Sequence, residues 1–375
     1  AATPGYWRRE AALYNAACAY AQAGDTAAAL DHLGRAVALG FRAPEHMAAD
    51  PELRPLHGGT RWEGLLEGAR ANLERWREER RDPARARVVA DDVERFWRAY
   101  DMAARRHTER SRAALFRRVY LEPGSAGLLD FYRLKIGSAE QLAWFVARHP
   151  RFYDGVREGT LRAAEAEPEI RAAFVRFREL YPDAVFPDVY LVVGRMSSGG
   201  TVSPRGLLVG TEMHGAGPET RTDELHLGLR RLAATADDLP STVLHELVHV
   251  QQPPPRHRTL LAAALREGGA DFVAELVRPR RTVPYYRAWG AAHEPEVWEI
   301  FAAEMHQQDW RGWLGNNATA TESWPADLGY FVGHRIAQGY YERAADKEAA
   351  LRALLRLDDP DAILRESGYA ERFAR

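Results

Sequence analysis

The chain carries two histidines and a glutamate inside an apolar stretch that has to fold as a buried helix. Residues 242–250 read T-V-L-H-E-L-V-H-V, so His245, Glu246 and His249 form an H-E-x-x-H pattern. Residues four apart lie on one face of a helix, and the two imidazoles can therefore reach the same point. Because buried polar side chains are costly without partners, a bound metal ion is favoured over the alternative, a helix with two surface histidines. The sequence predicts one zinc ion at this place, held in part by the two histidines.

A second helical segment offers a third ligand. Residues 265–276 have helical periodicity, with Glu267 near the start and Asp271 one turn later. Catalytic zinc sites usually have three protein ligands and leave a fourth position open, and Glu267 is the natural third ligand. Asp271 could accept the free ring N–H of a ligand histidine and fix its tautomer. The alternative is an ordinary solvated helix face, which the H-E-x-x-H pattern upstream makes the weaker interpretation.

These five residues together resemble the gluzincin class of zinc metallopeptidases. The surrounding letters, HELVHVQQ and EGGADFVAEL, also resemble a bacterial family of predicted zinc-dependent proteases. The resemblance implies that His245, His249 and Glu267 are zinc ligands. It further implies that Glu246 is the general base and that Asp271 orients a ligand histidine. The expected fold is a zincin-like domain with a small mixed sheet and an active-site helix.

The chemistry implied by the resemblance is hydrolysis of peptide bonds by a zinc-bound water. Zinc lowers the pKa of its bound water to about 7, and Glu246 would transfer the proton. Gluzincins commonly stabilise the oxyanion with a Tyr or His from a later segment. Tyr330 and His334 share a helix face, and the sequence leaves the choice between them open, with Arg335 as a candidate for binding a substrate carboxylate. Aromatic residues at helical spacing are more often part of the core, so a purely structural role is the alternative.

Two strands are expected shortly before the H-E-x-x-H helix. Residues 189–193 are β-branched and aromatic, residues 206–212 form a second apolar run, and a turn-rich loop at 197–201 separates them. By resemblance to gluzincins, residues 206–212 are the expected edge strand that holds a peptide substrate through backbone hydrogen bonds. An ordinary strand without a ligand is the alternative. The expected substrate-binding residues in this strand are Gly206, Leu207, Leu208 and Val209.

The first 75 residues have a separate, helical character. One helix ends at the Gly24-Asp25 turn, and residues 27–39 form a second helix with apolar residues on one face. Small residues, the Gly-Asp turn and a downstream Pro resemble a tetratricopeptide repeat. A groove that binds a protein partner and a helical cap on the next domain are both open interpretations.

The whole sequence is therefore expected to be a mainly helical α+β protein. The length of 375 residues, 46% hydrophobic and 28% charged, fits a globular protein with an ample core. The expected parts are a tetratricopeptide-like unit at 1–75, a charged linker at 76–87 and a zincin-like domain at 88–375. Within that domain we expect helices at 88–181, the sheet at 186–212, the zinc helices at 241–277 and further helices at 285–375.

Composition narrows the classes of partner. A net charge of −2 gives no electrostatic case for nucleic acid or a membrane surface, and no apolar run is long enough to span a bilayer. The single cysteine, Cys18, excludes an internal disulfide framework. The sequence begins with Ala and not Met, and an exported protein, periplasmic or secreted, is favoured over a cytoplasmic one.

Three functions follow from these features. The leading prediction is a zinc metallopeptidase acting on a peptide or protein substrate. The first alternative is a non-catalytic interaction protein that binds a partner through its repeat-like unit and holds a structural or vestigial zinc site. The second alternative is a zinc amidohydrolase that cleaves an amide other than a peptide bond.

Overall fold

The computed structural model describes residues 9–374, and the chain divides into two compact units. The first unit extends to residue 82, and the second begins at residue 83. None of the helices within the described residues is long and apolar enough to cross a membrane.

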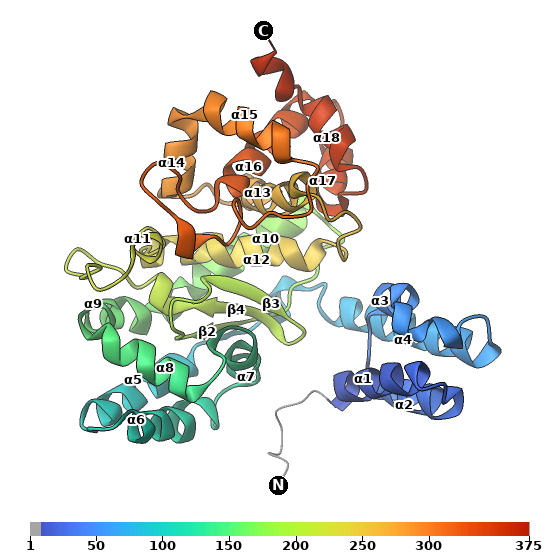
Figure 1. Cartoon of the computed structure of the whole chain (residues 1–375), viewed down its shortest axis with the longest axis horizontal. Coiled ribbons are helices and arrows are strands. Elements are labelled where there is room, and N and C mark those ends of the chain that lie inside the picture. The colour runs from blue at the N-terminus through green and yellow to red at the C-terminus, as the bar shows by residue number, and fades with distance from the viewer. Residues whose placement is uncertain (1–8, 375) are drawn as a thin grey trace. The chain divides into compact units, whose positions relative to one another are not determined.

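The first unit is built from helices around a small core of its own, coloured blue in Figure 1. Gly24, at a φ of +80°, makes the turn between the first two helices, and the Asp25 side chain accepts a hydrogen bond from the Ala28 N–H at 3.0 Å. Small residues such as Ala17 and Ala29 are fully buried where these helices pack. The helices are α1 (Arg9–Gln22), α2 (Thr26–Ala38), α3 (Pro44–Ala49), the 3-10 helix η1 (Pro51–Leu56) and α4 (Thr60–Glu79).

The second unit begins with a short strand and a layer of helices below the sheet in Figure 1. Aromatic side chains fill its core, and Tyr120 and Tyr153 donate hydrogen bonds to the carbonyls of Val193 and Gly194, which follow a strand. The elements are η2 (Pro83–Arg85), β1 (Val88–Val89), α5 (Asp91–Ala104), α6 (Glu109–Leu115), η3 (Phe116–Leu121), α7 (Ala126–Phe131), η4 (Tyr132–Ile136), α8 (Ala139–Arg148), α9 (Pro150–Leu161) and η5 (Ala163–Ala166). The next helix, α10 (Glu167–Leu180), lies on the opposite side of the sheet from this layer.

The sheet has four strands in the order β1-β2-β4-β3. β2 (Asp188–Val192) pairs in parallel with β1 and with β4 (Gly206–Gly210), whereas β3 (Gly200–Ser203) is antiparallel to β4. The expectation that residues 206–212 form the edge strand is wrong, because β4 lies between two strands and its backbone is already paired. β3, which lies partly in the stretch expected to be a loop, is the edge strand on that side. The mainly helical α+β class with a small mixed sheet is confirmed.

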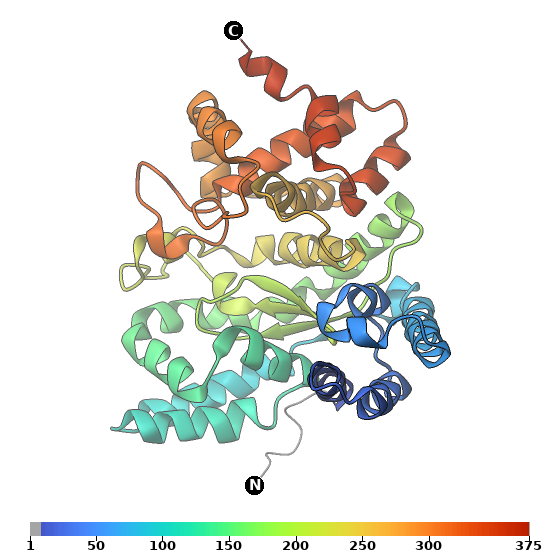
Figure 2. The same cartoon turned by 45° about the vertical axis from the view of Figure 1, so that its right-hand side comes forward.

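Helices cover the other face of the sheet. In both views α12 (Leu239–Gln251) lies between the sheet and the remaining helices, α13 (Leu260–Val277) and those that follow it (Figure 1 and Figure 2). The other elements are η6 (Thr211–Met213), α11 (Leu227–Arg230), η7 (Ala236–Asp238), α14 (Tyr285–Ala292), α15 (Glu294–Glu304), η8 (Asn317–Thr319), α16 (Leu328–Arg343), α17 (Lys347–Arg356), α18 (Pro360–Ser367) and η9 (Ala370–Phe373).

Two glycines allow α13 and α16 to cross at close range. A Cβ at Gly268 would collide with the backbone of Tyr330 and His334, and a Cβ at Gly333 would collide with the carbonyl of Ala264. Only glycine fits where two backbones approach this closely. The crossing fixes the start of α16 beside the segment of α13 that contains Glu267.

Candidate metal centre

Three side-chain atoms from α12 and α13 converge on one point. The Nε2 atoms of His245 and His249 lie 3.0 Å apart, and Oε2 of Glu267 lies 3.5 Å from the first and 3.2 Å from the second. Two ligands bound to zinc at about 2.0–2.1 Å in a tetrahedral arrangement lie about 3.3 Å from each other. The spacing of these three atoms therefore suits a zinc ion, and the side chains predicted as ligands are brought together.

The far side of each imidazole is held by a hydrogen-bond acceptor. Nδ1 of His245 lies 2.9 Å from Oδ1 of Asp271, and Nδ1 of His249 lies 2.7 Å from Oε1 of Gln252. The Gln252 amide nitrogen donates to the Arg266 carbonyl at 3.1 Å, which identifies the other amide atom as the acceptor oxygen. Both rings therefore donate through Nδ1 and turn the lone pair of Nε2 toward Glu267.

Asp271 is fixed by two further groups that the sequence did not indicate. Arg280 donates to Oδ1 at 2.6 Å, and the Tyr286 hydroxyl donates to Oδ2 at 2.5 Å. Burial alone would raise the pKa of Asp271, but Arg280 and the hydrogen bond to His245 hold that pKa well below its usual value. Asp271 is thus a carboxylate that orients His245. No residue spacing marked Arg280, Tyr286 or Gln252 beforehand, because each reaches the site from a loop or from another helix.

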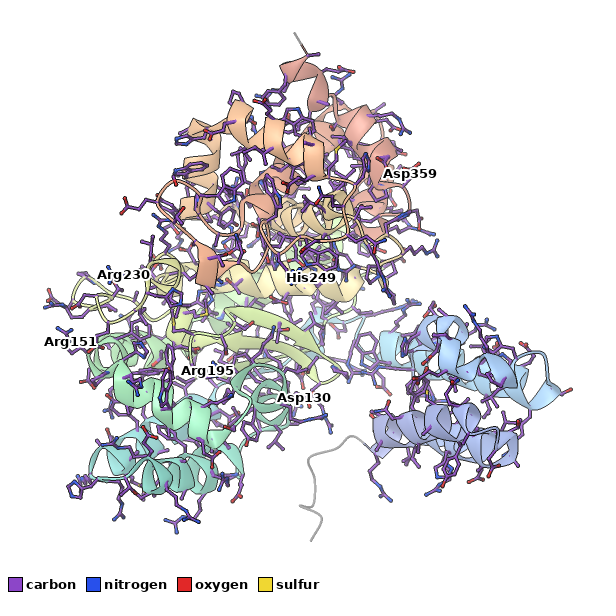
Figure 3. The ribbon with its side chains drawn as sticks, viewed as in Figure 1. Asp130, Arg151, Arg195, Arg230, His249 and Asp359 are labelled. Carbon is purple, nitrogen blue, oxygen red and sulfur yellow. The ribbon has the colours of Figure 1, made fainter. Side chains whose placement is uncertain are left out.

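Electrostatics favour a cation at this point. Two imidazole nitrogens and one carboxylate oxygen face each other in a setting that is largely shielded from water. Burial alone would lower the pKa of His245, but the hydrogen bonds to Asp271 and Glu267 raise it to about 10, so this point attracts positive charge. Such a set of acceptors repels itself unless a positive charge lies between its members. Imidazole and carboxylate ligands without a thiolate are typical of zinc sites with an open position. Figure 3 labels His249 near the C-terminal end of α12, directly below the C-terminal helices.

The three atoms lie in the wall of a large cavity, with a volume of about 810 Å³. Glu246 also lines the cavity, and burial raises the pKa of its carboxyl group. A Cβ at Gly200 would lie only 2.5 Å from Oε1 of Glu246, so the edge strand β3 passes directly over this carboxyl group. Gly200, Thr201 and Val202 of β3 line the cavity, whereas none of the β4 residues expected to bind substrate does so.

The structure separates the candidates near the C-terminus. Tyr330 lines the cavity, and its ring stacks on that of His245 with the centroids 5.9 Å apart. His334 does not line the cavity: its Nε2 meets Oε2 of Glu275 at 3.1 Å, two turns further along α13 than Glu267. Arg335 donates to Glu294 at 2.9 Å and is likewise not part of the cavity wall. Of these three residues only Tyr330 is brought to the centre.

Comparison with known proteins changes the functional prediction. The family model described as "Gliding motility protein GldB" matches residues 137–371, which include every residue of the metal centre. No curated protein and no solved structure matches the chain. The prediction of an enzyme that is a gluzincin-type zinc metallopeptidase, a hydrolase, is therefore wrong, because the family that matches is a motility family and not a peptidase family.

The match also bears on location. The family is one of lipoproteins, which agrees with an exported or envelope-associated protein. The choice between the periplasm and secretion stays a prediction. The first unit lies outside the matched residues, so its resemblance to a tetratricopeptide repeat is also still a prediction. Because the family model matches more than half of its residues, this chain belongs to the GldB family of gliding motility lipoproteins.

Proposed function

We propose that this protein is a non-catalytic interaction protein of the gliding-motility system, and that it holds one zinc ion. The family membership supports the part in motility. The observation that carries the metal is the convergence of the His245 and His249 Nε2 atoms on Glu267, with both opposite ring nitrogens already hydrogen-bonded. The family supports an interaction role over an enzymatic one, as in the first alternative that the sequence left open.

The proposed zinc ion has a structural consequence. His245 and His249 belong to α12, and Glu267 belongs to α13, so an ion bound by all three would cross-link the helix on the sheet to the helices above it. Bound zinc would supply positive charge that offsets the acceptors facing it, and it would offer one further position for a lone-pair donor. The three side chains that would hold the ion line the 810 Å³ cavity. Residues Glu246 and Tyr330 line the same space and would contact whatever enters it.

A partner segment entering this cavity is the proposed mode of interaction. The cavity lies beside the edge strand β3 and is lined by both polar and apolar groups, which is typical of sites that bind a ligand with a defined orientation. The first unit, with its separate core, is a second proposed surface for a protein partner. We also propose that the second unit has a zincin-like fold, because the H-E-x-x-H helix α12 packs against strands β3 and β4 of a small sheet.

Metal analysis of the full chain tests the proposal. We expect one zinc per chain in the wild type and a large loss of zinc in His249→Ala. Chelation should lower the melting temperature of the wild type and leave that of the variant almost unchanged. A wild type that binds no zinc under saturating conditions contradicts the metal part.

A peptide-library digest tests the non-catalytic part. Zinc-loaded wild type and Glu246→Gln should both leave the library intact, and both should retain the metal, because Glu246 is not among the three converging residues. Cleavage by the wild type that is lost in Glu246→Gln would overturn the non-catalytic assignment.

For the role in motility, replacing His249 by Ala in the source organism should reduce gliding, and unchanged gliding would separate the metal from the motility function.

A further inference from the structure

Buried polar atoms without a hydrogen-bond partner gather in the wall of the metal cavity. Within residues 9–374 there are six such side-chain atoms, and four belong to residues that line this cavity. They are Nδ1 and Nε2 of His214, Oδ1 of Asp238 and Oδ1 of Asn317. Buried polar groups are nearly always paired, so a concentration of unpaired atoms in one cavity points to a ligand. None of these three residues belongs to the proposed metal ligands.

Of the three residues, His214 is the one with two unpaired buried atoms. It follows η6 directly, and its exposed fraction is 6%. Neither ring nitrogen has a partner in good hydrogen-bond geometry among the described residues, and of these only the Gly199 backbone and the Asp238 carboxylate lie close enough to raise its pKa against the effect of burial. Burial lowers the pKa of His214 to about 4, so the ring is neutral at pH 7. A neutral imidazole offers one N–H donor and one bare nitrogen acceptor. Gly199 covers it closely, since a Cβ there would lie 3.5 Å from Nε2.

Asp238 brings a carboxylate to the same cavity. Its exposed fraction is 4%, and one oxygen, Oδ2, accepts from the Thr282 hydroxyl, whereas Oδ1 has no partner. Asp238 immediately precedes α12 but makes no side-chain capping bond, and it forms no ion pair with any residue of the described part. The nearby Arg280 is engaged with Asp271 and Glu275. Asp237, which precedes Asp238 in the sequence, is in contrast exposed and pairs with Arg281 at 3.1 Å.

We propose that His214 and Asp238 form a subsite for a primary ammonium group, supplied by the partner segment that enters the cavity. Oδ1 of Asp238 and a ring nitrogen of His214 lack donors, and a primary ammonium supplies both N–H donors and a positive charge. A neutral hydroxyl or amide would leave the buried carboxylate without a compensating charge, which is costly. The inference rests on the proposed function because it names what the cavity recognises, but it uses none of the proposed metal ligands.

Ring resonances of His214 in the labelled full-length protein test the subsite directly. Titration with n-butylamine at pH 7 should shift these resonances and reach saturation. N-butylacetamide, which is neutral, and tetramethylammonium, which has no N–H donor, should each bind at least about tenfold more weakly, because neither offers the carboxylate a charged N–H donor. Absence of a saturable shift, or equal binding of the three probes, would overturn the inference.

A pair of neighbouring variants isolates the carboxylate. Asp238→Asn should weaken butylammonium binding at least about tenfold, because a charge-assisted acceptor is lost. Asp237→Asn removes an adjacent carboxylate with the same change of charge and should leave binding unaltered. Equal effects of the two variants would contradict the inference. Melting curves confirm that both are folded, and the wild-type titration stands even if Asp238→Asn is not.

Two capped amino acids identify the source of the amine. Glycine methylamide presents an α-amino group, as at the start of a protein, and Nα-acetyl-lysine methylamide presents the side-chain amine. The stronger binder names the group, and binding of butylamine alone shows that the ligand is a small free amine, which overturns the assignment to a partner segment. Metal analysis and the amine titration together separate the two proposals. If the chain binds no zinc but butylamine still shifts the His214 resonances, the metal proposal is rejected and the subsite is kept. If the chain binds zinc but butylamine causes no shift, the subsite alone is rejected.

Discussion

Two glutamates of helix α13 contact histidines, and the two contacts differ in how many histidine nitrogens face the carboxylate. Near the start of the helix, Glu267 faces His245 and His249, whose Nδ1 atoms are already occupied by Asp271 and Gln252. The free lone pairs of both rings therefore point at one carboxylate oxygen. This first group, His245, His249 and Glu267 with Asp271 behind them, is the convergent cluster.

The second contact lies further along the same helix, between Glu275 and His334. A single Nε2 meets one oxygen of Glu275 at 3.1 Å, and the other oxygen is bound by Arg287 and lies 3.4 Å from Nε of Arg280. Burial would raise the pKa of Glu275, but His334 and Arg287 lower it below its usual value. Here the carboxylate is neutralised by protein cations, so this paired cluster has no place for an added ion. Contact between a histidine and a glutamate is common to both clusters, and only convergence of several lone pairs distinguishes a metal centre.

The sharpest test of this difference removes one carboxylate from each cluster. Glu267→Ala should weaken zinc binding by well over about 100-fold, since losing even an outer partner of a ligand costs about 10–100-fold. Glu275→Ala, the matched change on the same helix, should leave zinc affinity within about twofold of the wild type, because Glu275 lies outside the converging set. Competition with a chromogenic chelator measures both. Equal losses of affinity in the two variants would erase the distinction.

A smaller effect is expected behind the convergent cluster. Asp271→Asn should lower zinc affinity by about 10–100-fold, because His245 loses a charged acceptor that fixes its tautomer. The variant also leaves Arg280 with only Glu275, so its melting temperature should fall. Tyr286→Phe removes the other hydrogen bond to Asp271 without changing its charge and is the control; it should cost less than Asp271→Asn in both measurements. A larger loss in Tyr286→Phe would contradict the assigned order of the two partners.

The crossing of α13 and α16 connects both clusters and can be disturbed by one methyl group. Gly268→Ala should destabilise the fold by about 1–3 kcal/mol, the usual cost of overpacking, because its Cβ meets the backbone of Tyr330 and His334. Gly269→Ala is the matched control. Its Cβ meets only Ala337, at 3.9 Å, so it should be neutral or stabilising by about 0.5–1 kcal/mol. Urea unfolding measures both variants, and equal stability would mean that the backbones can separate freely.

The smallest expected effect concerns the paired cluster alone. His334→Gln should cost about 0.5–1.5 kcal/mol of stability, the net contribution of one hydrogen bond, because Glu275 keeps its arginine partners. Zinc content should not change. A loss of zinc in this variant would show that the two clusters act as one site.

The part of the convergent cluster that could be predicted is the part whose positions depend only on the helical repeat, which puts residues four apart on the same face. His245, His249 and Glu267 lie on helices that the apolar pattern indicates, and the four-residue spacings put Asp271 on the same side as Glu267. Spacing could not decide between Tyr330 and His334, because they also are four apart. The decision depends on how α16 crosses α13, which is set by Gly268 and Gly333, and contacts between distant segments leave no local signal in the sequence.

The sheet shows a similar limit. Residues 188–192 and 206–210 are apolar enough to be identified as strands, but their order is a matter of pairing. The turn-rich residues near 200 were expected to form a loop, and they instead contribute the edge strand β3, because its residues gain backbone hydrogen bonds from β4. β1 has only two residues, Val88 and Val89, and exists because β2 offers it a parallel partner. His214 gave no signal either, since its significance lies in the lack of partners.

Gly200 shows that the five-letter pattern H-E-x-x-H is too short a description of this corner of the protein. Its hydrogen atom occupies the only space between β3 and Glu246, so any larger residue would push the carboxyl group into another rotamer. A chain could keep all five letters of the pattern, exchange this one distant glycine and lose the arrangement. The full signature of the corner is therefore discontinuous and includes a position whose contribution is the absence of a side chain.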